Sequence, residues 1–181
     1  MIINNTRIPE VKIITPEVFH DERGYFYESY HKNKFMEMDI PHNFPQDNHV
    51  YSKQGVIRGL HYQLKKSQGK LVRAVFGEII DVAVDIRKGS SNFGDHVSVK
   101  LSDKNKKMLY IPEGFAHGYS VLSKYCVVNY KCTNTYNAES EYGIIWNDPT
   151  LNIDWKIYDP TISSKDNRLP KFDEQKNLPE F

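Results

Sequence analysis

Five side chains in the central part of the chain could together move a proton on a small molecule: Arg58, His61, Lys70, His117 and Tyr130. The ordinary pKa of histidine lies near neutral pH, so His61 can act as a general base. The hydroxyl of Tyr130 can act as a general acid, and a nearby cation that lowered its pKa would help. We therefore predict an enzyme in which His61 removes a proton while Arg58 holds an anionic substrate.

Three of these residues also have a purely structural interpretation. A histidine within a strand, such as His61, is usually a hydrogen-bonded structural residue. Tyr130 shares its strand face with apolar residues and could be a core tyrosine. Arg58 could point into solvent. The residue types alone therefore leave both the structural and the catalytic interpretation open.

The neighbours of His61 favour the catalytic interpretation. Lys70 follows on the next strand, and His117 lies in the segment from Pro112 to Tyr119. Basic side chains that converge inside a barrel are costly unless they are paired or used. Asp166 could orient His61 by accepting its second ring proton, although the sequence does not place Asp166 there.

The spacing of Arg58 and His61 poses a geometric problem. Strict alternation along a strand puts residues of opposite parity on opposite faces, so these two side chains should diverge. Gly59, between them, could provide a β-bulge that turns one of the side chains. We therefore predict a bulge at Gly59 that opens Arg58 and His61 into one cavity.

Short strands separated by turn signals must position these side chains. Many short strands with few helices predict a mainly β fold, a jelly-roll barrel with a pocket lined from several strands. Before residue 55 we expect an extended segment at 8–19, a turn at 21–24, a strand at 25–30 and a helix at 33–38, then the polar cluster 46–49 leading into a strand. The later strands are expected at 56–63, 70–76, 79–86, 96–101, 108–111, 118–122 and 126–133.

Composition predicts a soluble chain of one domain, residues 1–181, with 39% hydrophobic and 26% charged residues. The net charge of +1 points to neither nucleic acid nor a membrane surface as a partner. We expect no membrane span and no signal peptide, and hence a cytoplasmic location in which Cys126 and Cys132 are free buried thiols. Residues from about 147 to 181 lose the strand rhythm and should form an irregular tail that packs on the barrel.

A metal centre is the alternative chemistry for such a barrel. Barrels of this kind often bind a metal through a His-x-His pair, but the second position after His61 is Gln63. His61 and His117 supply two strong ligands, whereas a stable divalent site usually has three or four. The chain also lacks a glycine-rich dinucleotide-binding motif, so we expect neither a metal nor another cofactor.

Local clusters must supply any anion recognition, because the net charge is close to zero. Arg23, Arg58 and Lys165 could form such a site, since a guanidinium group suits phosphate oxygens, although each alone is more often a solvated charge. Tyr136 and Glu141 follow in a looser loop, where an exposed aromatic ring could stack on a nucleobase.

Motifs along nearly the whole chain, from about residue 10 to about residue 166, resemble the family of dTDP-4-dehydrorhamnose 3,5-epimerases. The most telling are Gly55-Val56-Ile57-Arg58-Gly59-Leu60-His61-Tyr62-Gln63 and Ile111-Pro112-Glu113-Gly114-Phe115-Ala116-His117-Gly118. The other matching segments are 21–26, 46–49, 68–73, 77–87, 130–133, 146–149 and 153–155. Because these segments occur in order and without large gaps, the resemblance is far more specific than any single motif.

The resemblance implies a cupin jelly roll with particular residue roles. His61 would be the base, with Asp166 as its partner, and Tyr130 the acid. Lys70 would steady an enolate oxygen, and Tyr136 would stack on a thymine ring. The remaining substrate-binding positions would be Arg23, Phe26, Glu28, Gln46, Asp47, Asn48, Arg58, His117, Glu141 and Lys165.

The family further implies no cofactor and a homodimer, in which the N-terminal strands, with Arg23 and Phe26, complete the neighbouring site. The implied activity is inversion of C3 and C5 of a dTDP-linked 4-keto-6-deoxyhexose on the way to L-rhamnose, a sugar of cell-surface polysaccharides. Both carbons flank the C4 ketone, so loss of either proton gives an enolate that a cation can stabilise.

Two alternatives stay open at this point. One is a single-centre epimerase or keto-isomerase on another nucleotide-linked sugar. The other is a cupin that binds a sugar without chemistry. The presence of His61, Lys70 and Tyr130, with Asp166 as a candidate partner, argues against a pure binding module.

Overall fold

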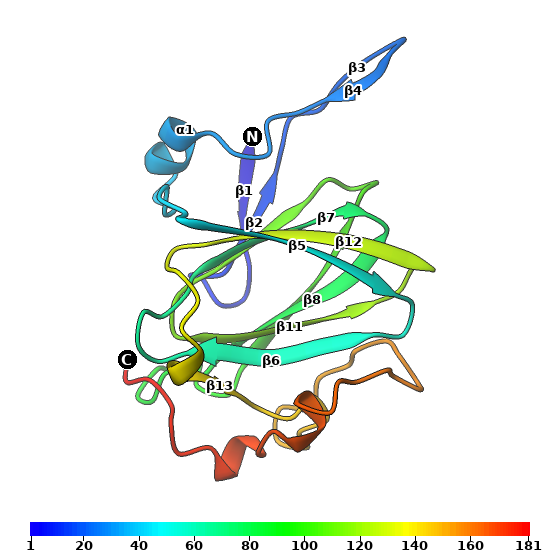
Figure 1. The fold of residues 1–181 in the computed structure, drawn as a ribbon. Helices are drawn as coiled ribbons and strands as arrows, with labels where there is room; N and C mark the ends of the chain where they lie inside the picture. The colour runs from blue at the N-terminus through cyan, green and yellow to red at the C-terminus, as the bar shows by residue number, and fades with distance from the viewer.

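The computed structural model describes residues 1–181 and contains two antiparallel sheets that face each other (Figure 1). The six-stranded sheet has the order β1-β2-β10-β7-β12-β5, and the five-stranded sheet has the order β13-β6-β11-β8-β9. The remaining two strands, β3 and β4, form a hairpin that stands away from both sheets. The mainly β fold with few and short helices is therefore confirmed.

The structure gives the elements these bounds. The strands before the central motif are β1 Ile2–Asn5, β2 Lys12–Thr15, β3 Phe19–Asp21, β4 Gly24–Phe26 and β5 Gln46–Lys53. The later strands are β6 Ile57–Gln63, β7 Lys70–Phe76, β8 Glu78–Asp85, β9 His96–Ser102, β10 Met108–Ile111, β11 Phe115–Val121, β12 Tyr125–Cys132 and β13 Glu141–Gly143. The helices are α1 Lys32–Glu37 and the short 3₁₀ turns η1 Ala138–Ser140, η2 Asp166–Arg168 and η3 Phe172–Glu174.

Three expected elements differ from the structure by more than a residue or two. The extended segment predicted at 8–19 begins with a turn, in which the backbone N–H of Val11 donates to the carbonyl oxygen of Ile8, and its strand is β2. The strand predicted at 25–30 ends at Phe26, because its only partner, β3, begins at Phe19 opposite it and leaves the following residues nothing to pair with. The strand predicted at 118–122 begins already at Phe115, so His117 lies on a strand. Gly118 therefore lies inside β11 and not at its start, at the position where β11 faces the bulge of β6.

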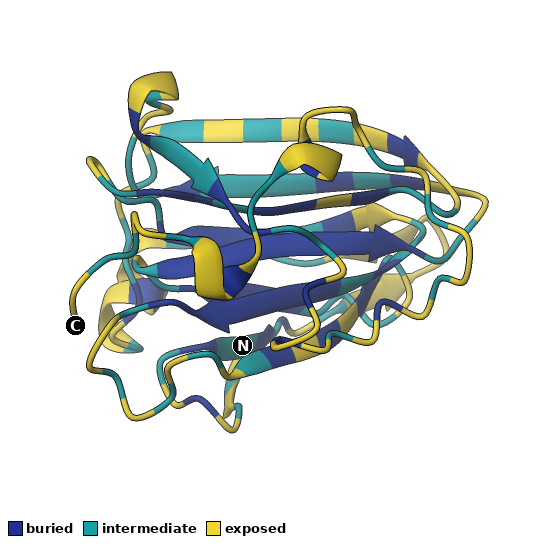
Figure 2. Ribbon diagram, turned by 90° about the horizontal axis from the view of Figure 1, so that it is seen from below, coloured by how far each residue is buried: buried dark blue, intermediate teal, exposed yellow.

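Alternation gives each central strand an inner and an outer face. In β8, Ile79 and Ala83 point between the two sheets and belong to the largest core cluster. Val82 and Val84 point the other way and pack against Trp155 of the C-terminal tail. Figure 1 shows this tail, orange to red, running along the outside of the five-stranded sheet. Strands β8 and β11 are consequently buried along most of their length (Figure 2).

Polar side chains interrupt the apolar inner faces of the barrel. The inner rows of four strands contain core residues such as Val72, Ala83, Val121 and Val128. The same rows also carry polar or ionisable side chains, which are Lys70 on β7, Asp81 on β8, His117 on β11 and Tyr130 on β12. Lys70 is the first residue of its strand, whereas the other three lie between buried residues of theirs.

Two smaller predictions concern the cysteines and the membrane. Cys126 and Cys132 lie on β12, and both are buried and unpaired, as predicted. No helix of the structure has the length and apolar character needed to cross a membrane.

Candidate active site

A cavity of about 570 Å³ lies where the side chains of Lys70, His117 and Tyr130 meet. Its walls come from both sheets, from the loop between β12 and β13, and from the C-terminal tail. Most of the predicted site residues line it, namely Gln46, Asn48, Arg58, His61, Lys70, His117, Tyr130, Tyr136, Glu141, Lys165 and Asp166. Residues that are far apart in the sequence therefore meet at one place.

A bulge on β6 brings Arg58 and His61 to the same cavity. His61 pairs with His117 of β11, whereas Arg58 pairs with Tyr119, so β6 takes three steps where β11 takes two. Gly59 has a φ of 115°, and a Cβ at this position would lie 2.6 Å from the carbonyl oxygen of His117. Only glycine fits this turn of the chain, and the predicted bulge is confirmed.

His61 is held by a carboxylate from the tail. Its Nε2 lies 2.8 Å from Oδ1 of Asp166, while Oδ2 of Asp166 accepts a hydrogen bond from the backbone N–H of Gly59. Burial alone would raise the pKa of Asp166, but the hydrogen bonds with His61 and Gly59 lower it overall. The carboxylate is thus ionised at neutral pH and fixes the ring so that Nδ1 is the nitrogen left to accept a proton.

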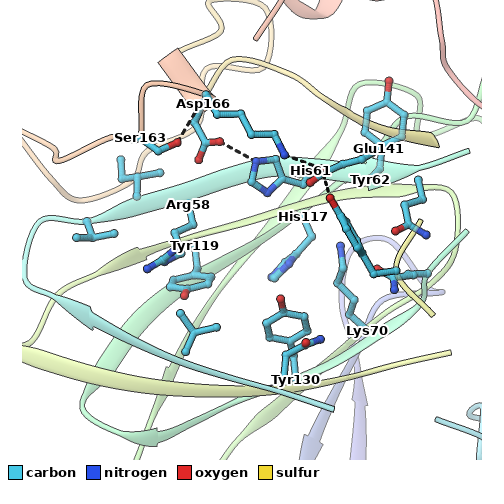
Figure 3. Close-up of a pocket in the computed structure, with 18 of the residues that line it drawn as sticks. Arg58, His61, Tyr62, Lys70, His117, Tyr119, Tyr130, Glu141, Ser163 and Asp166 are labelled. Atoms are coloured by element: carbon cyan, nitrogen blue, oxygen red, sulfur yellow. Dashed lines mark hydrogen bonds and ion pairs between the residues drawn. The ribbon is translucent and has the colours of Figure 1, made fainter. Parts of the chain in front are cut away.

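Tyr130 lies across the cavity from His61, as Figure 3 shows. Burial raises the pKa of its hydroxyl, and the nearby Arg58 cation only partly offsets this effect. The cation that the sequence analysis invoked is present, but it does not lower the pKa below the ordinary value of tyrosine. Tyr130 is consequently protonated at neutral pH, which is the form that a proton donor needs.

Lys70 is a buried amine on the same wall as Tyr130. Lys70 is the first residue of β7, and it pairs in register with Cys132 of β12. Its side chain is buried. Burial lowers the pKa of Lys70, and the neighbouring Cys132, Asp81 and Glu141 partly oppose that change. A donor held in such a buried position can stabilise negative charge that develops on a substrate oxygen.

His117 forms a second pair with a residue that the sequence analysis did not select. Its Nε2 lies 2.7 Å from Oδ1 of Asp81, and both side chains are buried. Burial lowers the pKa of His117, although Asp81 works against it. Alternation along β8 could have revealed Asp81, since it shares the inner face with Ile79 and Ala83.

Tyr119 was also missed and forms part of the cavity wall. Its hydroxyl is buried without a hydrogen-bond partner, and burial raises its pKa to about 12. It follows His117 by two positions on the inner face of β11, so the same alternation rule would have found it. Beside it, the Nε of Arg58 donates to the hydroxyl of Ser52 over 3.1 Å.

A polar network stands at the mouth of the cavity. Oε2 of Glu141 accepts hydrogen bonds from the hydroxyl of Tyr136 over 2.7 Å and from Nζ of Lys165 over 2.6 Å. Burial raises the pKa of Glu141, but the Lys165 and Tyr136 bonds lower it overall, so it is a carboxylate at neutral pH. The three residues come from the β12–β13 loop, from β13 and from the tail.

Four predicted binding residues lie outside this cavity. Asp47 is exposed on the outer face of β5, where Nζ of Lys131 approaches it to 2.7 Å. Arg23 lies at the turn of the β3–β4 hairpin and pairs with Asp21, and Phe26 of the same hairpin is 66% exposed. Glu28 follows the hairpin and pairs with Lys34. The roles of Arg23, Phe26, Glu28 and Asp47 stay predictions.

The arrangement defines a class of enzyme. A histidine and a tyrosine face each other across the cavity, and a buried lysine lies beside the tyrosine (Figure 3). No group of three or more His, Cys, Asp or Glu side chains is arranged to hold a metal ion. A site of this kind can remove a proton from a carbon next to a carbonyl and return one to it, which is the work of an isomerase or epimerase.

Comparisons with known proteins identify the family. The model of the dTDP-4-dehydrorhamnose 3,5-epimerases matches residues 5–174. The dTDP-4-dehydrorhamnose 3,5-epimerase of Pseudomonas aeruginosa is 51% identical over 167 residues, which cover 91% of this chain and 92% of that protein. The chain belongs to the dTDP-4-dehydrorhamnose 3,5-epimerase family and is a nucleotide-sugar isomerase.

Solved structures support the same assignment. A dTDP-6-deoxy-D-glucose-3,5-epimerase from Legionella pneumophila, in complex with dTDP-4-keto-L-rhamnose, has 47% identity and a TM-score of 0.96 over 99% of this chain and 97% of that one. A 3′-monoepimerase from Streptomyces bikiniensis, in complex with dTDP-quinovose, has 26% identity and a TM-score of 0.91 over 97% and 92%. The predicted family and the cupin jelly roll are thereby confirmed.

Proposed function

We propose that this protein inverts C3 and C5 of dTDP-4-dehydro-6-deoxy-D-glucose to give dTDP-4-dehydro-L-rhamnose, in dTDP-L-rhamnose biosynthesis. The observation that carries the proposal is the placement of His61 and Tyr130 on opposite sides of one cavity (Figure 3). We further propose that the reaction needs no metal or other cofactor, and that the chain works as one domain in the cytoplasm.

The proposed chemistry is the same at each carbon. Nδ1 of His61 takes the proton, the C–H electron pair moves into the C4 carbonyl, and an enolate forms. Lys70 stabilises the oxygen of this enolate, and the Asp166 carboxylate stabilises the imidazolium. The hydroxyl of Tyr130 then gives a proton to the same carbon from the opposite face. The carbon is inverted, and solvent exchange returns His61 and Tyr130 to their starting states.

The mouth of the cavity suits the nucleotide. Arg58 and Lys165 supply cations for the diphosphate, and the ring of Tyr136 is 54% exposed and free on its face to stack on thymine. The Legionella relative binds dTDP-4-keto-L-rhamnose, which supports a dTDP-linked sugar as the ligand of this chain.

The hairpin residues support a homodimer in which each chain completes its neighbour's site. The β3–β4 hairpin stands away from the sheets of its own chain, and its aromatic residues Phe19, Tyr25 and Phe26 are all more than half exposed. Exposed apolar clusters of this kind mark interaction surfaces. A reciprocal exchange of hairpins would cover them and bring Arg23 and Phe26 to the partner's cavity.

Complementation tests the dimer. Arg23→Ala and His61→Asn should each be nearly inactive, whereas mixed dimers of the two variants should regain activity, because one site of each then has both residues intact. A light-scattering mass of one chain, or no recovery in mixtures that exchange subunits, would contradict the shared site.

Deuterium incorporation in heavy water tests the chemistry. With dTDP-4-dehydro-6-deoxy-D-glucose as substrate, we expect deuterium at both C3 and C5 of the product by NMR or mass spectrometry. His61→Ala should abolish the exchange at both carbons. Full exchange in that variant would remove the assignment of His61 as the base.

A single-centre epimerase is the second candidate. It is favoured by one observation: the Streptomyces bikiniensis relative, which has the same fold, is a 3′-monoepimerase. Deuterium at one carbon only would support this candidate against double inversion. Binding of the substrate without exchange at either carbon would instead indicate a sugar-binding module.

A further inference from the structure

The loop that carries Tyr136 is held by glutamine side chains. Between β12 and η1, no backbone–backbone hydrogen bond joins two residues of the loop 133–137. The backbone groups of residues 134–137 bond instead to three glutamine side chains, which we call the glutamine clamp. Its members are Gln46 on β5, Gln63 at the end of β6, and Gln68 on the turn that follows.

Gln63 is the centre of the clamp. Its Oε1 accepts a hydrogen bond from Asn137 N over 2.9 Å, and its Nε2 lies 3.5 Å from the carbonyl oxygen of Thr135. The same Nε2 donates to the carbonyl oxygen of Lys66 over 2.9 Å. Both polar atoms of this amide are therefore bonded to backbone groups, the nitrogen through its two hydrogens and the oxygen as an acceptor. With 5% exposure, Gln63 cannot replace those bonds by water.

Gln46 and Gln68 complete the clamp on either side. Oε1 of Gln46 accepts a hydrogen bond from the backbone N–H of Tyr136 over 2.6 Å, and its Nε2 donates to Oδ1 of Asn48. Nε2 of Gln68 donates to the carbonyl oxygen of Asn134 over 2.8 Å. Each residue from 134 to 137 thus has a backbone group bonded to a glutamine.

The clamp and Glu141 together fix both ends of Tyr136. Gln46 and Gln63 hold the backbone at and after this residue, and Glu141 accepts the hydrogen bond of the tyrosine hydroxyl. The ring itself remains exposed at the mouth of the cavity. A loop that is ordered before binding loses less conformational entropy when the ligand arrives.

We propose that Gln63 is a positioning residue that presets Tyr136 to stack on the nucleobase, with Gln46 and Gln68 supporting the same loop. This inference rests on the proposed role of Tyr136 in binding the thymine ring. The position two after His61, where related barrels carry a metal-binding histidine, serves here to shape the nucleotide site. Gln46 acts through the loop, because its amide is bonded to Tyr136 and Asn48.

A double-mutant cycle on dTDP binding tests the proposal. The variants are Gln63→Leu, Tyr136→Ala and the two combined, and calorimetry measures the Kd of dTDP alone. Loss of the stacked ring should weaken binding about tenfold. Gln63→Leu should weaken it about five- to tenfold with kcat changed less than about twofold at saturating substrate, and it should have no further effect when Tyr136 is already alanine.

Gln54→Leu is the matched control. Nε2 of Gln54 also donates to a backbone carbonyl, that of Leu122 over 2.8 Å, but neither residue lines the cavity. This variant should bind dTDP as the original chain does. If Gln63→Leu does not fold, Gln68→Leu removes a single bond to the same loop and should weaken binding about threefold, again only while Tyr136 is present.

Each outcome of the cycle decides one question. Unchanged dTDP binding in Gln63→Leu, while Tyr136→Ala binds weakly, overturns the clamp and leaves the proposed function intact. Additive losses in the double variant also overturn it, because Gln63 would then act independently of Tyr136. A lower kcat with an unchanged Kd would assign Gln63 a structural role in the barrel. Unchanged binding in Tyr136→Ala would instead remove the stacking role from the proposed function.

Discussion

Two histidine–aspartate pairs face the same cavity, but they are built differently. His61 and Asp166 join a strand of the barrel to a tail residue that is 105 positions away, and the side chain of His61 is 30% exposed. His117 and Asp81 lie on the neighbouring strands β11 and β8, and the histidine side chain is only 8% exposed. The ring of His61 is therefore open to the cavity, whereas the ring of His117 is packed into the cavity wall.

This difference suits the pairs to different tasks. The proposed base must exchange its proton with solvent between turnovers, and the 30% exposed ring of His61 allows that. Burial lowers the pKa of His117 and keeps it neutral, so its role is to hold Asp81 and to donate or accept a fixed hydrogen bond. We therefore propose that the same two residue types form a proton carrier at His61 and a rigid polar wall at His117.

The largest expected effect comes from removing His61 as the proton acceptor, with the same substitution at His117 for comparison. His61→Asn should lower kcat by about 10²- to 10⁴-fold, because general-base catalysis is lost. His117→Asn should lower kcat far less, since the proton of C3 or C5 goes to His61. Steady-state kinetics with both variants measure the contrast. Equal losses of kcat in the two variants would show that His61 and His117 do not differ in this way.

For the free energy of unfolding we expect the opposite order, with the larger loss on substitution of His117. His117→Leu leaves the carboxylate of Asp81, whose Oδ2 already lacks a partner, buried without its histidine. Breaking a buried pair in this way costs about 3–5 kcal/mol of unfolding free energy. The same substitution at His61 should cost less, because its ring is 30% exposed and the buried Asp166 carboxylate keeps the hydrogen bond from the backbone N–H of Gly59. Urea unfolding of the two variants decides the point, and equal losses would contradict the burial argument.

Asp166→Asn should give a smaller, purely kinetic effect. The amide can still accept the Gly59 N–H bond, but it no longer stabilises the imidazolium or fixes the tautomer of His61. We expect a fall in kcat of about 10²-fold, with an unchanged urea midpoint. A variant as active as the original chain would mean that His61 needs no carboxylate partner.

Alternation accounts for the part of the site that the sequence predicts. Lys70, His117 and Tyr130 each share an inner face with core residues of the same strand, so their meeting follows from strand positions. The bulge was predictable because Gly59 separates two polar residues of opposite parity. Asp81 obeys the same rule and was missed only because no chemistry was sought on that strand.

The remaining site residues depend on contacts that no local pattern encodes. Asp166 reaches His61 through a tail without periodicity, which is anchored where Thr161 forms a bridge with Val56 at the start of β6. The residue types made this pairing possible, and the resemblance to a family turned it into a specific prediction. The hairpin residues Arg23 and Phe26 are similar, because their proposed site lies in another chain.

The pH dependence of stability offers the smallest and most specific test of the buried pair. Burial depresses the pKa of His117 in the folded chain, so the unfolded chain, with a pKa near 6.5, binds a proton more readily. The stabilising contribution is therefore complete above about pH 6.5 and declines as the pH falls below that value. For one histidine this loss is at most about 1.4 kcal/mol at pH 5.5.

His117→Gln isolates that contribution, because the amide can still donate to Asp81 but does not titrate near neutral pH. Urea unfolding at pH 7.5 and pH 5.5 should show a smaller acid loss in this variant than in the original chain. Burial also lowers the pKa of His96, which is present in both proteins, so its effect cancels in the comparison. Identical losses in the two proteins would show that His117 gains its proton as easily in the folded chain as in the unfolded one. Burial would then not distinguish His117 from His61.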